Sequence, residues 1–245
     1  MVKKIDKMTK DEVSEILLKS RICKNLDKQH IENIIAKSNL VVYKKNITIF
    51  EERQCGSFFF IILSGYVKVI KRYSDGKNPL IISILGMGDS FGEIALLNEN
   101  KERSLTIVSI HEVSLLKVDH SVFENLYNSS MAFVKNLLQI ALERLKHSNE
   151  QTKYILLSAK DAKFRVYFVF KMLIKKFASD QIDNEIIDLI IPFNNSELAT
   201  FACMLKSNFS RLKLKMIEEG VIFELEKGHY QIPRYDQIMK LFEGV

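Results

Sequence analysis

Apolar and polar positions follow two alternating kinds of period along this chain. From Glu12 to Lys19 and from Leu26 to Lys37, apolar residues recur every three or four positions, which predicts helices. From Leu40 onward, short runs rich in Val, Ile and Phe are separated by Gly, Asn and Asp, which predicts strands joined by tight turns. These runs are Leu40–Phe50, Phe58–Leu63, Tyr66–Lys71, Leu80–Leu85, Leu105–Ile110 and Val113–Val118. Many short strands at regular spacing favour a sandwich or barrel, here a jelly roll.

A helical period returns after these strands. Asp119 is a suitable N-cap for a short helix that continues to Tyr127. The next stretch, Met131 to Leu157, contains neither Gly nor Pro and would span about 40 Å as one helix. Its narrow apolar seam favours pairing with a second helix and hence a homodimer, while packing against its own barrel is the alternative. The seam is Val134, Leu137, Leu138, Ala141, Leu145, Ser148, Thr152 and Ile155.

The C-terminal third follows a helix, turn, helix and hairpin order. An Asn194-x-x-Glu197 capping box predicts the start of a helix, and Gly220 is suited to end the second one. The predicted elements are helix Ala162–Phe177, strand Ile186–Pro192, helix Ser196–Ala202, helix Lys206–Glu219 and hairpin Phe223–Ile232, which turns at Lys227–Gly228. This order is typical of a winged helix-turn-helix.

Together these patterns predict an α+β chain of three parts. Residues 1–130 form a jelly-roll barrel, residues 131–159 a dimerisation helix and hinge, and residues 160–245 the winged helix-turn-helix.

Composition narrows the class of protein. The chain has 245 residues, of which 47% are hydrophobic and 27% charged, as is ordinary for a globular protein. The longest apolar run, Phe58–Leu63, is too short to span a membrane, and no apolar stretch follows the lysine-rich N-terminus, so we expect a cytoplasmic protein with no membrane partner. Cys23, Cys55 and Cys203 are too scattered for a disulfide framework or a cysteine-based metal cluster, and we expect no metal. The net charge of +6 permits an anionic partner.

One loop carries residues suited to an anionic ligand. It runs from Gly88 to Leu97 and is followed by Arg103 and Ser104. Gly92 lets the backbone approach an anion, and Glu93 can accept hydrogen bonds from hydroxyl groups. Arg103 is a permanent planar cation that suits a phosphate. The simpler alternative is a salt bridge between Glu93 and Arg103.

The string Phe91-Gly-Glu-Ile-Ala-Leu-Leu97 with Arg103-Ser104 resembles the phosphate-binding cassette of cyclic-nucleotide-binding domains. From about residue 15 to 235, the order of motifs is similar to that of the bacterial cyclic AMP receptor protein and fumarate–nitrate regulator (Crp/Fnr) superfamily. The resemblance implies that Glu93 and Gly92 hold a ribose hydroxyl and that Arg103 and Ser104 hold a cyclic phosphate. It also implies adenine contacts from Ser148 and Asn149, one of them reaching across a dimer.

The chain departs from the family pattern at a few positions. Arg53 and Gln54 replace the usual Gly-Asp of the first barrel turn, and Leu105 replaces a small residue after the cassette. In the helix-turn-helix, Cys203 stands where Gly is common and Leu205 where a capping Ser is common. The barrel departures bear on the identity of the effector more than on the fold.

The second predicted helix of the C-terminal part is basic. Four of the ten residues from 206 to 215 are Lys or Arg and none is acidic, which favours contact with nucleic acid over a merely solvated face. The resemblance places base-reading positions at Lys206, Ser207 and Arg211, and Arg211 suits a bidentate guanine contact. Asn208, Lys213 and Lys215 complete the expected DNA-binding set, with Lys213 or Lys215 holding phosphate. Leu212, Met216 and Ile217 are expected to face the core.

These features predict a dimeric transcription regulator that is not an enzyme. Its effector would be cyclic AMP or a related cyclic nucleotide, and its partners a pseudo-palindromic DNA site, a second copy of the chain and RNA polymerase. One alternative is a regulator of the same superfamily that senses a redox signal, haem or an organic acid. Another is a cyclic-nucleotide-binding regulatory subunit that acts on a protein partner.

Overall fold

The computed structural model describes residues 8–72, 80–157, 161–233 and 235–243. The chain divides into two compact units, Met1–Lys146 and His147–Val245, with the boundary inside the long helix α5 (Met131–Leu157). Residues 158 and 159 of the predicted hinge lie outside the described residues. The predicted division at residues 130 and 160 stays a prediction.

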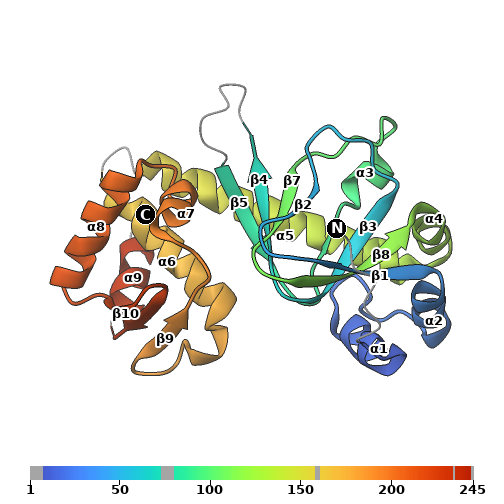
Figure 1. Cartoon of the computed structure of the whole chain (residues 1–245), viewed down its shortest axis with the longest axis horizontal. Helices are drawn as coiled ribbons and strands as arrows, with labels where there is room; N and C mark the ends of the chain where they lie inside the picture. The colour runs from blue at the N-terminus through green and yellow to red at the C-terminus, as the bar shows by residue number, and fades with distance from the viewer. Residues whose placement is uncertain (1–7, 73–79, 158–160, 234, 244–245) are drawn as a thin grey trace. The chain divides into compact units, whose positions relative to one another are not determined.

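The first unit is built on two antiparallel sheets (Figure 1). One sheet has the order β1 (Ser38–Tyr43), β8 (Val113–Asp119), β3 (Phe58–Ser64) and β6 (Ser90–Phe91). The other has the order β2 (Thr48–Phe50), β7 (Thr106–Ser109), β4 (Val67–Lys71) and β5 (Leu80–Leu85). Apolar side chains from both sheets, among them Phe60, Val69, Phe91 and Ile107, form one core cluster.

Strand β3 is apolar at successive positions because both of its faces are covered. Phe60 and Ile62 belong to the core shared by the two sheets, whereas Phe59 and Ile61 on its other face pack against helices. Successive side chains of a strand point to opposite faces, so a strand covered on both faces needs apolar residues at every position. The covering helices are α1 (Lys10–Lys19), α2 (Lys28–Ala36), α4 (His120–Ser129) and the first half of α5.

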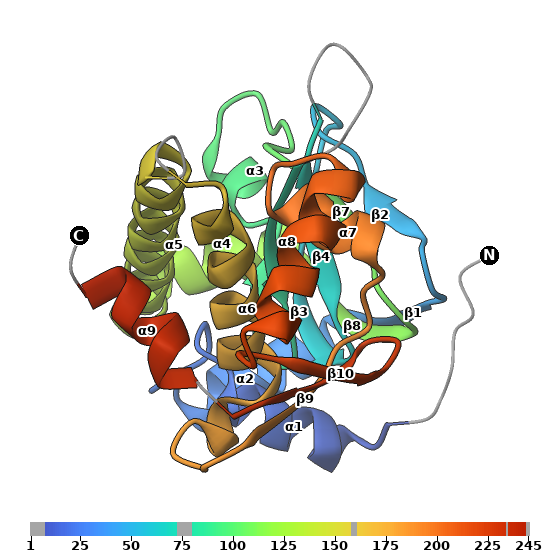
Figure 2. The same cartoon turned by 90° about the vertical axis from the view of Figure 1, so that its left-hand side faces the viewer.

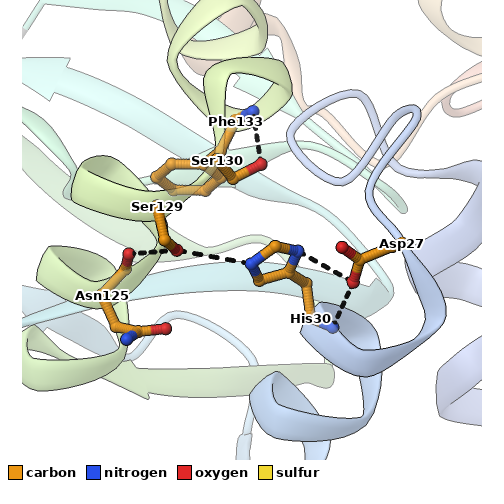
Figure 3. A network of polar contacts seen from close by, with 6 residues as sticks. All are labelled: Asp27, His30, Asn125, Ser129, Ser130 and Phe133. Atoms are coloured by element: carbon orange, nitrogen blue, oxygen red, sulfur yellow. Dashed lines mark hydrogen bonds and ion pairs between the residues drawn. The ribbon is translucent and has the colours of Figure 1, made fainter.

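A polar junction joins α2 to α4 (Figure 3). His30 Nε2 lies 3.4 Å from Ser129 Oγ, and His30 Nδ1 lies 2.9 Å from Asp27 Oδ1. The Ser129 hydroxyl donates to the Asn125 carbonyl at 2.6 Å. Because this hydroxyl proton is directed to Asn125 rather than to His30, the geometry suits a helix junction and does not prepare Ser129 as a nucleophile.

Helix α5 carries two different apolar faces. Phe133, Leu137 and Ile140 are buried against the barrel of their own unit. Leu138 and Leu145 are 60% and 58% exposed. The prediction of a single seam is therefore wrong for Leu137, which is separated from Leu138 by about 100° around the helix axis. The side chain of Ile155 lies outside the described residues.

The sequence pattern misjudged two local details of the barrel. The apolar run Leu40–Phe50 is not one strand, because a turn with Asn46 at φ 59° divides it into β1 and β2, which lie in different sheets. The loop from Gly88 to Leu97 contains β6 and the one-turn helix α3 (Ile94–Leu97), neither of which was predicted. Both elements are shorter than the windows over which periodicity is detectable.

The second unit combines helices with a small antiparallel sheet. Its helices are α6 (Lys163–Phe177), the 3-10 turn η1 (Ser179–Gln181), α7 (Asn195–Phe201), α8 (Lys206–Glu218) and α9 (Tyr235–Glu243). The sheet has the order β10 (Phe223–Glu226), β11 (His229–Ile232) and β9 (Ile187–Ile190). Figure 2 shows α7 and α8 side by side. The core includes Phe170, Phe209 and Tyr230, and the Phe170 and Tyr230 rings meet edge to face.

Candidate ligand site and candidate nucleic-acid interface

The cassette loop places its glycine where the backbone turns left-handed. Gly92 follows β6 with φ +89°, and a Cβ atom there would lie 2.6 Å from Arg103 Nη1. Phe91, one residue earlier, stacks on Phe60 with ring centroids 5.1 Å apart. Phe91 and Leu96 are both buried, so they anchor the loop as the sequence analysis expected. This anchoring fixes the backbone around Gly92 and Glu93.

Arg103 is a buried cation, and only 5% of its surface is exposed. Its Nη1 and Nη2 donate to the carbonyls of Gly92 and Phe58, each at 2.7 Å. The guanidinium also lies over the Phe50 ring, 4.2 Å from the centroid. Burial lowers the pKa of Arg103, opposed by the negative charge of Glu93, but an arginine still keeps its proton. The site therefore presents a fixed positive charge.

Glu93 is paired with a residue that the sequence analysis did not single out. Its Oε1 accepts from Arg144 Nη1, and Arg144 Nη2 donates to the Ser90 carbonyl at 2.6 Å. Glu93 is 5% exposed, so the pair places a carboxylate of the cassette loop inside the unit. The alternative of a Glu93–Arg103 salt bridge is wrong for the described structure, because each partner has a different contact.

Periodicity could have revealed Arg144. It follows the buried residues Phe133, Leu137 and Ile140 at spacings of four, three and four, so it lies on the barrel-facing side of α5. A charged residue on an otherwise buried face needs a partner of opposite charge. The sequence alone did not identify that partner as Glu93.

Three buried polar atoms of this site have no hydrogen-bond partner among the described residues. They are Glu93 Oε2, Arg103 Nε and Ser90 Oγ. Buried polar atoms are nearly always hydrogen-bonded in folded proteins, so unpaired atoms on the cassette loop and on Arg103 beside it indicate a place for a ligand. An acceptor on Glu93 and a donor on Arg103 fit a ligand that carries both a hydroxyl group and an anion.

The other predicted ligand contacts, Ser104, Ser148 and Asn149, are exposed, unlike the buried Glu93 and Arg103. Ser104 follows Arg103 directly, and its side chain is exposed. Ser148 and Asn149 belong to the second unit, where both are exposed on α5. The structure thus brings Gly92, Glu93 and Arg103 together and leaves the roles of Ser148 and Asn149 as predictions.

The second candidate site is the helix pair α7 and α8. Asn194 and Glu197 form the predicted capping box at the start of α7. The turn that follows holds Cys203 at φ +51°, a left-handed conformation that explains why Gly is common at this position. Arg165 on α6 donates to the Cys203 carbonyl at 2.8 Å and supports the turn. Leu205 is the N-cap of α8 and provides no side-chain capping bond.

Helix α8 turns most of its predicted DNA-binding residues outward. The exposed ones are Lys206, Ser207, Asn208, Arg211 and Lys215. Lys213 is 3% exposed and pairs with Glu224 on β10, so its prediction as a phosphate contact is corrected. It lies about 200° around the helix from Arg211, on the side of Phe209 and Met216. The prediction placed Lys213 by its charge, whereas its helical position puts it in the core.

A cavity of about 460 Å³ lies between the start of α7, the start of α8 and the hairpin turn. Its lining includes Asn195, Ser196, Lys206, Glu224, Lys227 and Tyr230. Ser196 and Lys227 were not among the predicted DNA contacts. Lys227 could have been suspected, because it occupies the tip of the predicted hairpin.

Comparison with known proteins identifies a domain within the first unit. Residues 40–130 match the family described as "Cyclic nucleotide-binding domain". This chain carries a cyclic nucleotide-binding domain. Gly92, Glu93, Arg103 and Ser104 all lie inside the matched segment of this domain, and Arg144 lies beyond it.

Two curated relatives extend the similarity past the cyclic nucleotide-binding domain. The CRP-like cAMP-activated global transcriptional regulator of Mycobacterium tuberculosis (strain ATCC 25618 / H37Rv) is 26% identical over 137 residues, which are 56% of this chain and 60% of the relative. The cyclic AMP receptor protein of Thermus thermophilus is 25% identical over 181 residues, which are 74% of this chain and 78% of the relative. The chain thus spans 60% of the length of the first of these relatives.

Solved structures share the fold. The c-di-GMP responsive global regulator CLP of Xanthomonas campestris superposes with a TM-score of 0.70 at 18% identity, covering 84% of this chain and 99% of that one. The predicted α+β class and the resemblance to the Crp/Fnr superfamily are confirmed by these matches and by further neighbours of the CRP/FNR family.

The described residues contain neither a metal-binding cluster nor a membrane-spanning helix. Among them, no group of three or more His, Cys, Asp and Glu residues could hold a metal ion. In the same described residues, no helix is long and apolar enough to cross a membrane.

Proposed function

We propose that this protein is a homodimeric transcription regulator that binds a cyclic nucleotide in its first unit and double-stranded DNA through its second. The observation that carries the proposal is a pair of buried atoms inside a cyclic nucleotide-binding domain, Glu93 Oε2 and Arg103 Nε, which have no hydrogen-bond partner among the described residues. Because the proposed partner is DNA, we place the protein in the cytoplasm. No catalytic step is assigned to any residue.

In this proposal, each residue of the cassette has a distinct role. Glu93 Oε2 accepts from the ribose 2′-hydroxyl, while Arg103 Nε and its remaining N–H groups donate to the cyclic phosphate. Ser104 and the backbone at Gly92 add neutral contacts. Ser148 and Asn149 are proposed to contact the base, by family resemblance. Cyclic AMP or a related cyclic nucleotide is the proposed effector, since the curated relatives carry cyclic AMP in their names.

Arg144 gives the effector site a connection to the long helix. Its guanidinium bridges Glu93 and the Ser90 carbonyl, so any ligand that engages Glu93 also affects a residue of α5. A ligand that binds one arrangement of this helix better than another shifts the population toward it. We propose that this shift favours the dimer in which two α8 helices lie about 34 Å apart, one turn of DNA.

The proposed dimer interface is the exposed apolar face of α5. Leu138, Leu142 and Leu145 are each more than half exposed, and their spacing of four and three residues places them on one stripe. The opposite face is already buried in the unit's own core, so only the exposed stripe is available to a second copy of the chain.

DNA contacts are proposed for the outer face of α8. Arg211 would read a base edge, with Lys206, Ser207 and Asn208 beside it, and Lys215 would hold a phosphate. The cavity lined by Ser196, Lys206 and Lys227 would accommodate the DNA backbone. A pseudo-palindromic site follows from the two-fold symmetry of the dimer, and RNA polymerase is the further proposed partner.

The effector role is tested with Arg103→Leu. Removing one side of a desolvated charge pair costs on the order of 2–5 kcal/mol, or about 30-fold or more in affinity. We expect the variant to lose the thermal shift that cyclic AMP or cyclic GMP gives the wild type, and to lose nucleotide-stimulated DNA binding while remaining dimeric. Arg103→Lys should rescue only in part, because lysine lacks the planar fork. A variant that still responds normally would point to a non-nucleotide signal such as a redox signal, haem or an organic acid.

The DNA role is tested by comparing two exposed residues of α8 on a site selected from random duplexes. Arg211→Ala should cost about 1–3 kcal/mol and relax preference at one base pair per half-site. Lys215→Ala should weaken binding to all sequences alike and reduce the salt dependence. Equal, sequence-independent losses would contradict the assignment of Arg211. Nucleotide binding without any DNA binding would instead support a regulatory subunit that acts on a protein partner.

A further inference from the structure

A buried lysine lies beneath the proposed DNA face of the second unit. The Lys213 side chain is 4% exposed, and its ammonium donates to Glu224 Oε2 at 2.6 Å and to Asn195 Oδ1 at 3.1 Å. The Tyr230 hydroxyl lies 3.5 Å away and itself donates to Glu224 Oε1 at 2.9 Å. The three ammonium protons therefore each have an acceptor within reach, which makes this a complete polar network.

This network joins α8 to the wing, the hairpin formed by β10 and β11. Glu224 and Tyr230 are directly paired across the two strands. All four residues of β10 are exposed, so this strand has no buried apolar side chain to hold it against the helix. Among the side-chain contacts described for β10, the one that reaches α8 is the ion pair of Glu224 with Lys213.

The wing tip is placed by contacts on both sides. At its turn, Gly228 has φ +85°, and its carbonyl accepts from the Ile191 amide at 2.8 Å. Lys227, immediately before it, lines the same cavity as Glu224, Tyr230 and Lys206. A change in the position of Glu224 would move β10, the strand that ends directly before Lys227.

Stability alone does not account for a lysine at this position. Replacing a buried ion pair by apolar residues of similar volume is often neutral or stabilising. Position 213 lies on the same face as the buried Phe209 and Met216, where a methionine or leucine would pack without any desolvation cost. The Lys213–Glu224 pair is better explained by the position in which it holds β10 relative to α8.

We propose that the Lys213–Glu224 ion pair is a positioning device, which holds the wing against α8 so that Lys227 contacts a phosphate of the DNA backbone. The inference rests on the proposed function, because it assumes that α8 and the wing bind DNA. Lys213 itself touches no DNA. Its effect on binding passes through Glu224 and β10 to Lys227.

The test measures binding of the full-length protein to a mixed-sequence duplex of about 30 base pairs, between about 50 and 200 mM salt. In the wild-type background, Lys227→Ala should reduce the magnitude of the negative slope of log affinity against log salt by about 0.9, the loss of one phosphate contact. Lys213→Met should lower it by a similar amount, although the residue is buried. The double variant should show no further loss. Lys213→Arg, which can still pair with Glu224, should keep the wild-type slope.

Lys215→Ala is the matched control, because Lys215 is exposed on the same helix and has no part in the network. The reduction in the magnitude of the slope that Lys215→Ala causes should add to the reduction caused by Lys213→Met. If Lys213→Met fails to fold, Lys213→Met with Glu224→Leu leaves no unpaired charge and gives the same prediction. The inference would be overturned if folded Lys213→Met kept the wild-type slope. It would also be overturned if adding Lys227→Ala to Lys213→Met reduced the magnitude of the slope by a further full phosphate contact. A wild type that binds no duplex would overturn the proposed function instead.

Discussion

Gly56 and Arg103 pack so closely that any side chain at position 56 would meet the guanidinium. A Cβ atom on Gly56 would lie 2.2 Å from Arg103 Cζ. Gly92 also comes close to the guanidinium, with its own Cβ position 2.6 Å from Nη1. The guanidinium at the centre of the proposed effector site is thus placed by two glycines as well as by its hydrogen bonds to the carbonyls of Gly92 and Phe58.

Gly56→Ala should therefore displace the guanidinium rather than unfold the barrel. The methyl group meets the end of a long side chain, which can move more readily than backbone. We expect affinity for the cyclic nucleotide to fall by about tenfold or more, measured by calorimetry, with little change in circular dichroism. In Gly220→Ala, no described atom lies within 4 Å of the added Cβ, but φ +67° makes the substitution strained. This control should lower the stability of the second unit and leave the affinity for the nucleotide unchanged. Unchanged affinity in Gly56→Ala would show that Arg103 does not hold the effector where it now lies.

The proposed dimer predicts opposite outcomes for neighbouring leucines of α5. Aspartate at both Leu138 and Leu145 should give a folded monomer in sedimentation experiments, because both side chains are exposed in the single chain. Aspartate at Leu137 should instead unfold the first unit, because that residue is 8% exposed in the core and would bury an unpaired charge. A wild type that is monomeric at micromolar concentration would remove the basis for the first expectation, whereas the second depends only on the core of the single chain.

The N-cap residue of α8, Leu205, makes no side-chain capping hydrogen bond, so a polar residue at this position should stabilise the helix. Leu205 is 65% exposed and makes no side-chain capping bond, so Leu205→Ser loses little apolar burial and adds an acceptor for an amide of the first turn. The free energy of unfolding of the second unit should rise by about 0.5–2 kcal/mol, as measured by denaturant titration. Leu205→Ala lacks the hydroxyl and should give no such gain. Equal stability of the two variants would show that α8 begins elsewhere.

His147 predicts how stability depends on pH. Burial lowers the pKa of His147 below its ordinary value of 6.5; Glu150 opposes this shift and Lys175 adds to it. The folded protein therefore binds this proton less readily than the unfolded chain does. His147 should not affect the pH dependence well above pH 6.5, but stability should fall as pH drops below that value. His147→Gln should flatten the fall in melting temperature, and an unchanged pH profile would contradict the assignment.

Local sequence patterns determined most elements of this protein. The boundaries of α5 and the capping box of α7 were predicted from residues close together in the chain, because periodicity and caps act over a few positions. The cassette residues Gly92, Glu93 and Arg103 were likewise found from their spacing and family resemblance. The division of Leu40–Phe50 between two sheets was not predictable in this way, since it depends on which partners the strands find.

The tertiary structure alone decided which charges meet. Glu93 pairs with Arg144, 51 residues away, rather than with Arg103, only ten residues away. Lys213 pairs with Glu224 although the charge pattern suggested a DNA contact. Electrostatic partners are chosen by distance and burial in the folded unit, and sequence spacing encodes distance only within one helix or strand. Sequence therefore identified the residues able to bind an anion, while folding determined which of them already have partners and which remain available to a ligand.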